Sequence, residues 1–542
     1  MNLLEYRHQY YHSGMRGEPT IPAPDILGKA DAIDEWTNQK LAESNFINID
    51  SYEQFVDSSC VILAGRIGSG KTTMLNRLKY SIETGTNKYY NDVVMIDTRD
   101  FIARLGTIIR LSELAKLTYS EIEYAARQEW EKLINIIVMK KMYDRYKDDD
   151  PKDCKKIQAY LEAQELIASR SISAILDRIT ERLNSIDNFF TKGVALATSA
   201  ASYAMSVNYD DALDELRTLI QEKGKVLVLI DSIEKYEFND RIILAILNAL
   251  VNLCVEYSRK EPQICLKMAT PSELIPKLEA INTEKLSNKI VYIRWSYQNL
   301  KEFISVRIYR YIKQISYQNI DRHDAVDFFD KYYDELCLTR CDFYFPTFSY
   351  CLSHTQKEPR QLLSIYNAWL NFEKLQPNST RMEFVERAIT NDELSRLKGA
   401  LSIYSSVHPL IYEMFTRTFN GRKYCFSESE FDEWLNVCSN IRQPLDAYDL
   451  KKLFVSSGLV GTMVEMHDVE PNHKVMRNKN TVRIKEVLFE YQHKECLSFN
   501  ATTKFCLHPM VFDILNIEVD KNTFVYPKPV EQDFEYIPWN QR

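Results

Sequence analysis

The sequence predicts an α/β fold that begins with a parallel β-sheet. Short apolar segments recur along the first half of the chain, helical patterns separate them, and a glycine-rich turn follows the first segment. Short β-branched runs between polar residues are typical of buried parallel strands, which helices then cover on both faces. The full prediction is a parallel sheet with a large helical insertion, followed by a helical region and a smaller α+β region.

Length and composition describe an ordinary globular protein of several domains. The chain has 542 residues, which is too long for one hydrophobic core. Hydrophobic residues make up 45% and charged residues 27%, values typical of globular proteins. The net charge of −8 argues against a protein that coats nucleic acid, although a local basic patch is compatible with it.

The terminus and the cysteines predict a cytoplasmic location. The first residues, Met1 to Arg7, are charged and do not resemble a secretory signal. The longest uncharged run, Gly193 to Tyr209, is too short and too weakly apolar to span a bilayer. Eleven cysteines, an odd number, fit a reducing compartment better than a disulfide framework. We therefore expect no membrane partner.

The first strand leads into a phosphate-binding pattern. A strand at 61–64 is followed by Gly65, four further residues and Gly70-Lys71-Thr72, and a helical pattern begins there. Glycines let successive backbone N–H groups point inward, and the helix N-terminus adds positive potential. Lys71 can reach the β- and γ-phosphates, and the Thr72 hydroxyl can ligate Mg²⁺. The alternative is a glycine-rich surface turn that binds no phosphate. The predicted binding residues are Gly65, Arg66, Ile67, Gly68, Ser69, Gly70, Lys71, Thr72 and Thr73.

A second pattern supplies an acid for the metal. The run at 225–231 places β-type apolar residues before Asp231, as in a Walker B strand. A strand buried on both faces delivers one carboxylate to its C-terminal edge, where Mg²⁺ lies in such proteins. Any buried strand can end in Asp, so this pattern alone does not indicate a metal site. It does so here because a phosphate-binding pattern precedes it in the expected order. Further strands are predicted at 92–97, 264–270 and 289–295, and a helix at 239–257.

The remaining segments are mainly helical. Residues from about 101 to 223 form a predicted helical insertion whose charge runs are solvated helix faces. After residue 299 the chain is again helical, and beyond 381 helices precede an apolar two-stranded ribbon, as in a winged-helix unit. The predicted domains are a 1–50 extension, a 51–298 core, a 299–380 lid, a 381–520 winged-helix-like domain and a 521–542 tail.

With these features the chain resembles the STAND/AAA+ branch of P-loop ATPases, with a helical lid and a winged helix after the core. The resemblance implies that Lys71 and Thr72 bind the phosphates of ATP and Mg²⁺, and that Asp231 is the Walker B acid. In AAA+ proteins the catalytic glutamate directly follows that acid, whereas this chain has Ser232 there. Glu234 is therefore the candidate that orients or deprotonates the water. Its alternative role is that of a surface residue in the turn.

The same resemblance suggests two further nucleotide contacts. Thr270, at the end of the 264–270 strand, corresponds to a sensor residue that reads the γ-phosphate. Arg360, in Glu358-Pro359-Arg360, corresponds to a lid arginine. A plain loop residue and a solvated helix arginine are the alternatives for these two. The segment 284–289, where an arginine finger would lie, contains no arginine, which puts hydrolysis activated by a neighbouring subunit in doubt or moves the finger elsewhere.

The predicted function is an ATP-binding and ATP-hydrolysing switch. The resemblance implies a role in bacterial antiphage defence or stress signalling, through homo-oligomerisation or a separate effector protein, since no nuclease or protease motif is visible. The alternative is an initiator- or loader-like ATPase that binds duplex DNA through the 447–457 helix, which offers Lys451 and Lys452. A small-molecule kinase is a third possibility, for which no acceptor-site motif is visible.

Overall fold

The structure is a computed structural model that describes most of the chain. No helix within the described ranges is long and apolar enough to cross a membrane. The described residues are 26–29, 31–57, 59–98, 102, 118–149, 154–169, 174–175, 178, 208–231, 240–260, 263–275, 288–338, 344–376, 379–405, 408–441, 445–469, 482–493, 497–520 and 523–528.

The chain divides into two compact units, which we describe separately. The parallel-sheet unit comprises Asn48–Ile67 and Lys71–Arg294. The mixed-sheet unit comprises Met1–Ile47, Gly68–Gly70 and Trp295–Arg542. The boundary therefore runs through the glycine-rich loop, whose tip groups with the mixed-sheet unit.

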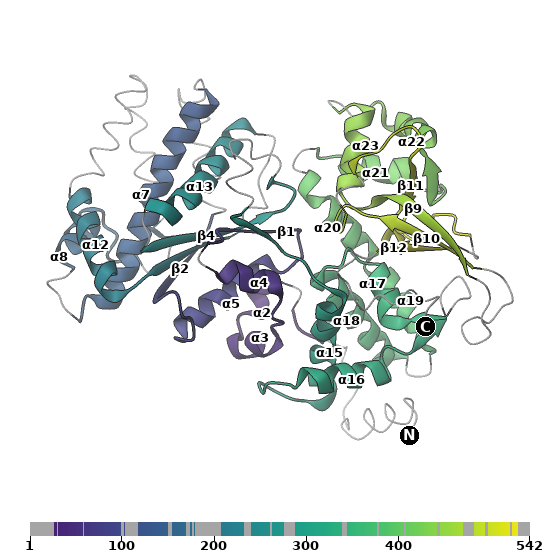
Figure 1. Cartoon of the computed structure of the whole chain (residues 1–542), viewed down its shortest axis with the longest axis horizontal. Helices are drawn as coiled ribbons and strands as arrows, with labels where there is room; N and C mark the ends of the chain where they lie inside the picture. The colour runs from purple at the N-terminus through teal and green to yellow at the C-terminus, as the bar shows by residue number, and fades with distance from the viewer. Residues whose placement is uncertain are drawn as a thin grey trace. The chain divides into compact units, whose positions relative to one another are not determined.

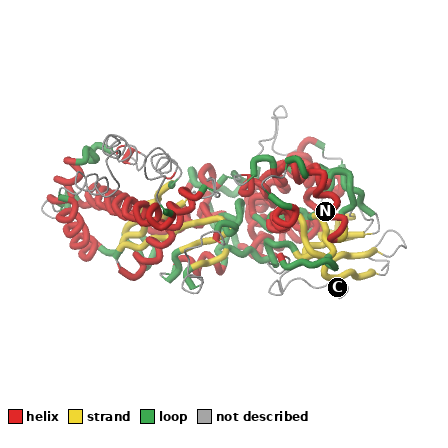
Figure 2. Tube along the Cα trace, turned by 90° about the horizontal axis from the view of Figure 1, so that it is seen from above, coloured by secondary structure: helices red, strands yellow, loops and turns green. Residues whose placement is uncertain are grey.

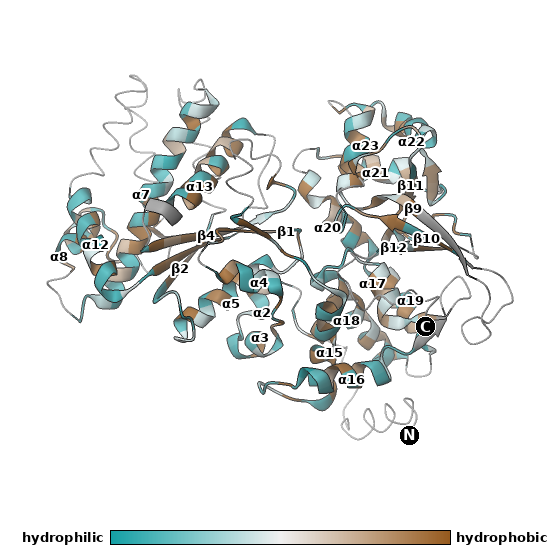
Figure 3. Cartoon of the chain, viewed as in Figure 1, coloured by the Kyte–Doolittle hydropathy of each residue, from teal (hydrophilic) through white to brown (hydrophobic). Residues whose placement is uncertain are grey.

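The parallel-sheet unit contains the predicted five-stranded sheet. Its strands pair in the order β2-β3-β4-β1-β5, and every neighbouring pair is parallel. The strands are β1 (Ile62–Gly65), β2 (Asp92–Asp97), β3 (Val226–Asp231), β4 (Ile264–Pro271) and β5 (Ile290–Tyr292). All strand segments predicted from the sequence are present, and the α/β fold class is confirmed. Every residue of β3 is buried, as expected of a strand covered on both faces. The apolar character of its neighbours β2 and β4 is visible in Figure 3.

Helices cover both faces of this sheet (Figures 1 and 2). In Figure 1, α7 and α13 lie above the strands, and α4 and α5 lie below them. The helices are α4 (Asp50–Val56), α5 (Lys71–Glu83), α7 (Tyr119–Tyr146), α8 (Lys155–Ala163), α12 (Tyr209–Lys223) and α13 (Arg241–Lys260). Helices α7, α8 and α12 belong to the predicted insertion. The Trp130 indole N–H of α7 donates to the carbonyl oxygen of Ile246 in α13 at 3.1 Å, which fixes the insertion to the core helix.

A buried lysine joins β4 to the segment before β1. Lys267 is 1% exposed. Its ammonium donates to the carbonyl oxygens of Phe55, Asp57 and Cys60 at 2.5, 2.6 and 2.6 Å. Carbonyls at the end of a helix lack intrahelical partners, so this cation closes the end of α4 and fixes the entry into β1. Burial lowers the pKa of Lys267 to about 8.

The mixed-sheet unit begins with a helical region. Helices α2 (Ala32–Glu35) and α3 (Gln39–Asn45), from the predicted extension, pack against α15 (Tyr297–Lys313) through buried arginines. Arg307 donates to Glu35 at 2.8 Å, and Arg310 donates to Asn45 at 2.9 Å. The other elements are α16 (Arg322–Tyr332), β6 (Leu336–Leu338), β7 (Tyr344–Pro346), α17 (Thr347–Ser353), α18 (Pro359–Leu375), α19 (Arg381–Asn391) and α20 (Glu393–Ser405).

The C-terminal part of this unit is a five-stranded mixed sheet with helices. Its strands pair in the order β12-β10-β9-β11-β8, and only β10 and β12 are parallel. The elements are α21 (Ile411–Phe419), β8 (Cys425–Ser427), α22 (Glu428–Leu435), a 3-10 turn (Asn436–Cys438), α23 (Ala447–Ser456), β9 (Val460–Val469), β10 (Val482–Leu488), β11 (Lys504–Leu507), a 3-10 turn (Pro509–Val511) and β12 (Thr523–Pro527). The predicted ribbon corresponds to β9 and β10, and three further short strands extend it.

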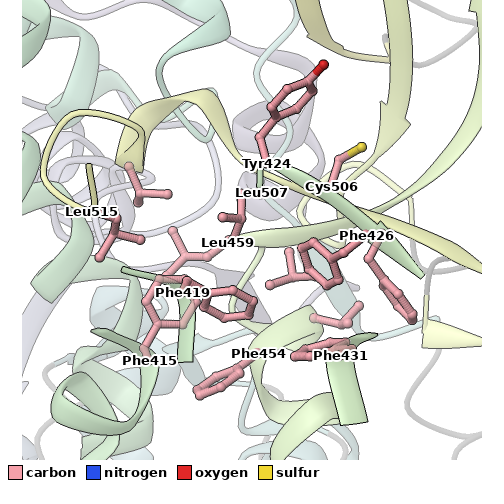
Figure 4. Close-up of a cluster of buried hydrophobic side chains, with 14 of the residues drawn as sticks. Phe415, Phe419, Tyr424, Phe426, Phe431, Phe454, Leu459, Cys506, Leu507 and Leu515 are labelled. Carbon is pink, nitrogen blue, oxygen red and sulfur yellow. The ribbon is translucent and has the colours of Figure 1, made fainter. Parts of the chain in front are cut away.

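An aromatic core holds these helices on the sheet (Figure 4). Phe415 and Phe419 of α21 contact Phe454 of α23 with ring centroids 5.0 and 5.7 Å apart. Phe431 of α22 contacts Phe505 of β11 at 5.2 Å. All five rings are fully buried, and the burial of each contributes about 2–3 kcal/mol to the stability of this domain.

A disulfide joins two strands of the mixed sheet. Cys425 of β8 and Cys506 of β11 lie opposite each other in antiparallel register, with Cα atoms 4.3 Å apart, and their sulfurs are bonded. The odd number of cysteines predicts a reducing compartment rather than a disulfide framework, and this bond is not expected from the sequence. Strand pairing between distant segments brings these two together, and that pairing is not visible in cysteine counts.

Candidate functional site

The glycine-rich loop has the backbone that its sequence pattern requires. It connects the end of β1 at Gly65 to the start of α5 at Lys71. Gly68 and Gly70 have φ angles of +96° and +97°, a region that residues with a Cβ rarely adopt. A Cβ placed on Gly68 would lie 2.8 Å from Oε2 of Glu358, so a larger residue would also meet a side chain. The positive φ angles therefore favour glycine at both positions. At Gly68 a side chain would also clash with Glu358.

Lys71 lies buried over this loop. Its side chain is 4% exposed, and its ammonium donates to the carbonyl oxygens of Gly65 and Arg66 at 3.1 and 3.0 Å. Thr72 and Thr73 follow in the first turn of α5, where backbone N–H groups lack intrahelical acceptors. The Lys71 side chain and the first N–H groups of α5 therefore lie at the same end of the loop, an arrangement that suits an anion.

Two buried hydroxyls beside the loop have no hydrogen-bond partner among the described residues. Ser69, at the loop tip, is 5% exposed, and Thr270, on β4, is fully buried. Thr270 is in register with Ala64 of β1, immediately before the loop begins. Buried polar groups are nearly always satisfied, so these hydroxyls fit a site that is completed by a polar ligand.

Asp231 lies at the same edge of the sheet as the loop. It ends β3 and is 3% exposed. Only β4 separates β3 from β1, so the two strand ends are about 10 Å apart at an inter-strand spacing of about 4.8 Å. Among the described residues there is no group of three or more His, Cys, Asp or Glu able to hold a metal. Mg²⁺ often takes one carboxylate, substrate oxygens and waters, so Thr72 and Asp231 fit as its protein ligands.

The other predicted site residues have different surroundings. Nε of Arg66 lies 3.8 Å from Oε1 of Glu273, in an ion pair beside the loop. Arg360 is exposed, and its Cβ lies 3.4 Å from the position of a Cβ on Gly68. The structure thus brings Arg360 to the loop tip. Glu234 lies outside the described residues.

Three residues near these groups were not predicted as site residues. The Trp295 indole N–H donates to the carbonyl oxygen of Ser69 at 2.8 Å. The Glu358 carboxylate lies 2.8 Å from the position of a Cβ on Gly68, and Asp97 of β2 is in register with Asp231. Asp97 carried a usable signal, because its strand also ends in an acid. The Trp295 contact joins residues that are 226 positions apart and leaves no local pattern.

Comparisons with known proteins find likenesses among solved structures. No protein-family model matches the chain, and no curated protein matches its sequence. Among solved structures, the chain is similar to a Walker-type ATPase of Pyrococcus abyssi, with 13% identity and a TM-score of 0.38. The match covers 87% of this chain and 96% of that one. By its own sheet and loop, the chain is an α/β protein with a Walker-type phosphate loop between β1 and α5.

Proposed function

We propose that this protein is an ATP-binding and ATP-hydrolysing switch of the STAND/AAA+ type. The observation that carries the proposal is the loop itself, with two glycines at positive φ and a buried lysine at the first turn of α5. Such a loop presents several N–H donors and one cation to a single small volume, which suits a chain of phosphates better than any uncharged ligand.

Each residue of the site has a distinct part in this proposal. Lys71 moves its donors from the carbonyls of Gly65 and Arg66 to the phosphate oxygens. The N–H groups of the loop and of Thr72 and Thr73 hold the remaining oxygens. The buried Thr270 hydroxyl serves as the sensor of the terminal phosphate, because it has no hydrogen-bond partner among the described residues.

Mg²⁺ would be held by Thr72 and Asp231. When bound, it neutralises charge on the phosphates during their transfer. Burial of Asp231 and its fixed place at a strand end keep its carboxylate oriented without a further conformational cost. The Cβ of Arg360 lies 3.4 Å from the position of a Cβ on Gly68, and we assign Arg360 the lid-type contact with the nucleotide.

The loop tip also connects to the helices that follow the sheet. Ser69 accepts the Trp295 N–H, and Trp295 lies two residues before α15. The Trp295 ring contacts Phe303 of α15 with centroids 5.9 Å apart. A ligand that changes the loop therefore acts directly on the start of α15. This arrangement supports a switch, in which nucleotide affinity differs between two conformations.

The biological role that we propose is signalling in bacterial antiphage defence or stress. Output occurs through self-assembly or a separate effector protein in the cytoplasm, since no nuclease or protease motif is visible in the sequence. Duplex DNA is a weaker candidate for the partner. Lys451 is 2% exposed and is ion-paired with Glu428 and Asp432, which leaves Lys452 as the exposed member of the two lysines predicted to contact DNA.

Calorimetric titration with ATP and Mg²⁺ tests the proposal. We expect Lys71→Ala to weaken ATP binding by about 100-fold, near 3 kcal/mol, because the site loses the buried ammonium that the proposal assigns to the phosphates. Lys79→Ala is the matched control. It removes a lysine from the same helix whose side chain is 37% exposed and only weakly paired with Glu83. Equal affinities for ATP in the wild type and Lys71→Ala would contradict the proposal.

Light scattering with and without ATP and Mg²⁺ tests the switch separately. We expect the wild type to change its mass or its hydrodynamic radius on binding, and Lys71→Ala to show no change. A wild type that binds ATP without any such change would exclude assembly as the output, while leaving nucleotide binding intact.

A further inference from the structure

The ends of β2 and β3 form an unusual pair. Asp97 and Asp231 are register partners on these adjacent parallel strands, and each is the last residue of its strand. Thr98 follows Asp97 and is fully buried. Its hydroxyl donates to the carbonyl oxygen of Asp231 at 3.0 Å, and its backbone N–H donates to the same oxygen at 3.4 Å. The two strand ends are therefore held at a fixed separation.

This register places both carboxylates on one side of the sheet. Side chains at paired positions of neighbouring parallel strands leave the same face, and the strands are about 4.8 Å apart. The two acids differ in exposure, since Asp231 is 3% exposed and Asp97 is only partly buried. Two carboxylates in unequal environments are suited to different tasks.

The strand order ranks these acids by distance from the phosphate loop. The loop follows β1, and the sheet continues outward through β4, β3 and β2. Asp231 therefore lies two strands from the loop and Asp97 three strands, or about 10 and 14 Å at the usual spacing. The nearer and more buried acid fits the metal. Asp97 is only partly buried and lies one strand farther from the loop than Asp231.

We propose that Asp97 orients the water that attacks the terminal phosphate. This inference rests on the proposed ATP hydrolysis and adds a catalytic residue to it. The water oxygen forms a bond to the γ-phosphorus, and the bond from that phosphorus to the bridging oxygen breaks. ADP leaves with the electron pair, one proton stays on the inorganic phosphate and the other passes to solvent. The Asp97 carboxylate accepts a hydrogen bond from the water and so fixes its direction of attack.

The test compares Asp97→Asn with the wild type by calorimetry and steady-state kinetics. The amide keeps the size of the side chain and removes the carboxylate. We expect kcat to fall by about 100-fold, while the dissociation constant for ATP with Mg²⁺ stays within about twofold. Retained affinity also shows that the variant is folded. Asp148→Asn, which changes an exposed acid of the same unit, is the control and should leave both quantities unchanged.

Each other outcome overturns the inference in a distinguishable way. Wild-type turnover in Asp97→Asn would show that the carboxylate is not needed. A parallel loss of affinity and kcat would assign Asp97 to binding or to the metal. A wild type that binds ATP without turnover would exclude the catalytic role but leave nucleotide binding standing. A wild type without ATP affinity would remove the proposed function itself.

Discussion

Thr98 donates its side-chain hydrogen bond to the main-chain carbonyl oxygen of Asp231 at 3.0 Å. This bond joins β2 to β3 at the point where both strands reach the candidate site. It lies in a fully buried position, so the carbonyl has no access to water that could replace the hydroxyl. The position of the Asp231 carboxylate therefore depends on a neighbouring strand as well as on its own.

Thr98→Val should loosen this edge of the sheet. The substitution keeps the shape of the side chain and removes its donor, which we expect to cost about 1 kcal/mol of unfolding free energy. The melting temperature of the parallel-sheet unit should fall by about 2–4 °C in scanning calorimetry. Thr98→Ser retains the hydroxyl and is the control. Equal melting temperatures for Thr98→Val and the wild type would show that the bond contributes nothing to stability.

Gly68→Ala should abolish ATP binding more completely than its backbone strain explains. The residue combines a positive φ with the Glu358 carboxylate at 2.8 Å from the new Cβ. Gly85 provides a close control, because its φ is +71° and no atom lies within 4 Å of a Cβ there. We expect Gly85→Ala to cost about 1 kcal/mol in stability and nothing in ATP affinity, which isothermal titration would measure. Similar ATP affinities for the two variants would contradict the importance of the loop conformation.

Lys267→Met should destabilise the parallel-sheet unit by about 3 kcal/mol at pH 7, because three carbonyl oxygens lose a shared donor. Calorimetric melting of this unit would detect the loss. Lys225→Met, at an exposed position next to β3, should have little effect. A melting temperature equal to that of the wild type would mean that the bonds from Lys267 are unimportant.

Lys267→Met should also remove a pH dependence of the unfolding free energy of the parallel-sheet unit. Burial lowers the pKa of Lys267 to about 8, against 10.5 for an ordinary lysine. Between these pH values the unfolded chain binds more protons than the folded protein, so the contribution of this group to stability increases with pH. The stability difference between wild type and Lys267→Met should widen by up to about 3 kcal/mol from pH 8 to pH 10.5. If the unfolding free energies of the two proteins changed equally with pH over this range, the prediction would be refuted.

Replacing Cys425 and Cys506 by serine should destabilise the mixed-sheet unit alone. The disulfide closes a segment of 81 residues, and such cross-links typically contribute about 2–4 kcal/mol. In calorimetry we expect the transition of the mixed-sheet unit to shift to lower temperature and that of the parallel-sheet unit to stay in place. Cys60→Ser, in the parallel-sheet unit, serves as the control. An unchanged profile for the double variant would show that the bond is not formed in solution.

The parallel sheet could be predicted from the sequence because its strands are buried on both faces. A run such as 226–231 is apolar throughout and ends abruptly in an acid, so it is visible without any knowledge of its neighbours. The strands of the mixed sheet differ in this respect. β8 has three residues, and its pairing partner β11 lies about 80 positions further along, so local periodicity carries no signal for it.

Some residues of the candidate site could likewise be predicted from local sequence, and others could not. The candidate residues from Gly65 to Thr73 occupy consecutive positions, so the sequence pattern alone identifies them as candidates. Asp97 and Trp295 join the site through strand register and through a hydrogen bond between distant segments. Such relationships are properties of the folded chain. Thr270 could be predicted only by resemblance, because nothing in its own segment distinguishes it from an ordinary strand end.

The hydrogen bond from Trp295 to Ser69 has a practical consequence for dissecting the protein. A fragment cut at the apparent boundary after Arg294 would keep the whole motif from Gly65 to Thr73 but would lose the indole that holds its tip. Failure of such a fragment to retain nucleotide would then reflect the cut rather than the motif. A shortened version intended for ligand screening should therefore extend through α15, so that Trp295 keeps both its hydrogen-bond acceptor, Ser69, and its edge-to-face contact with Phe303.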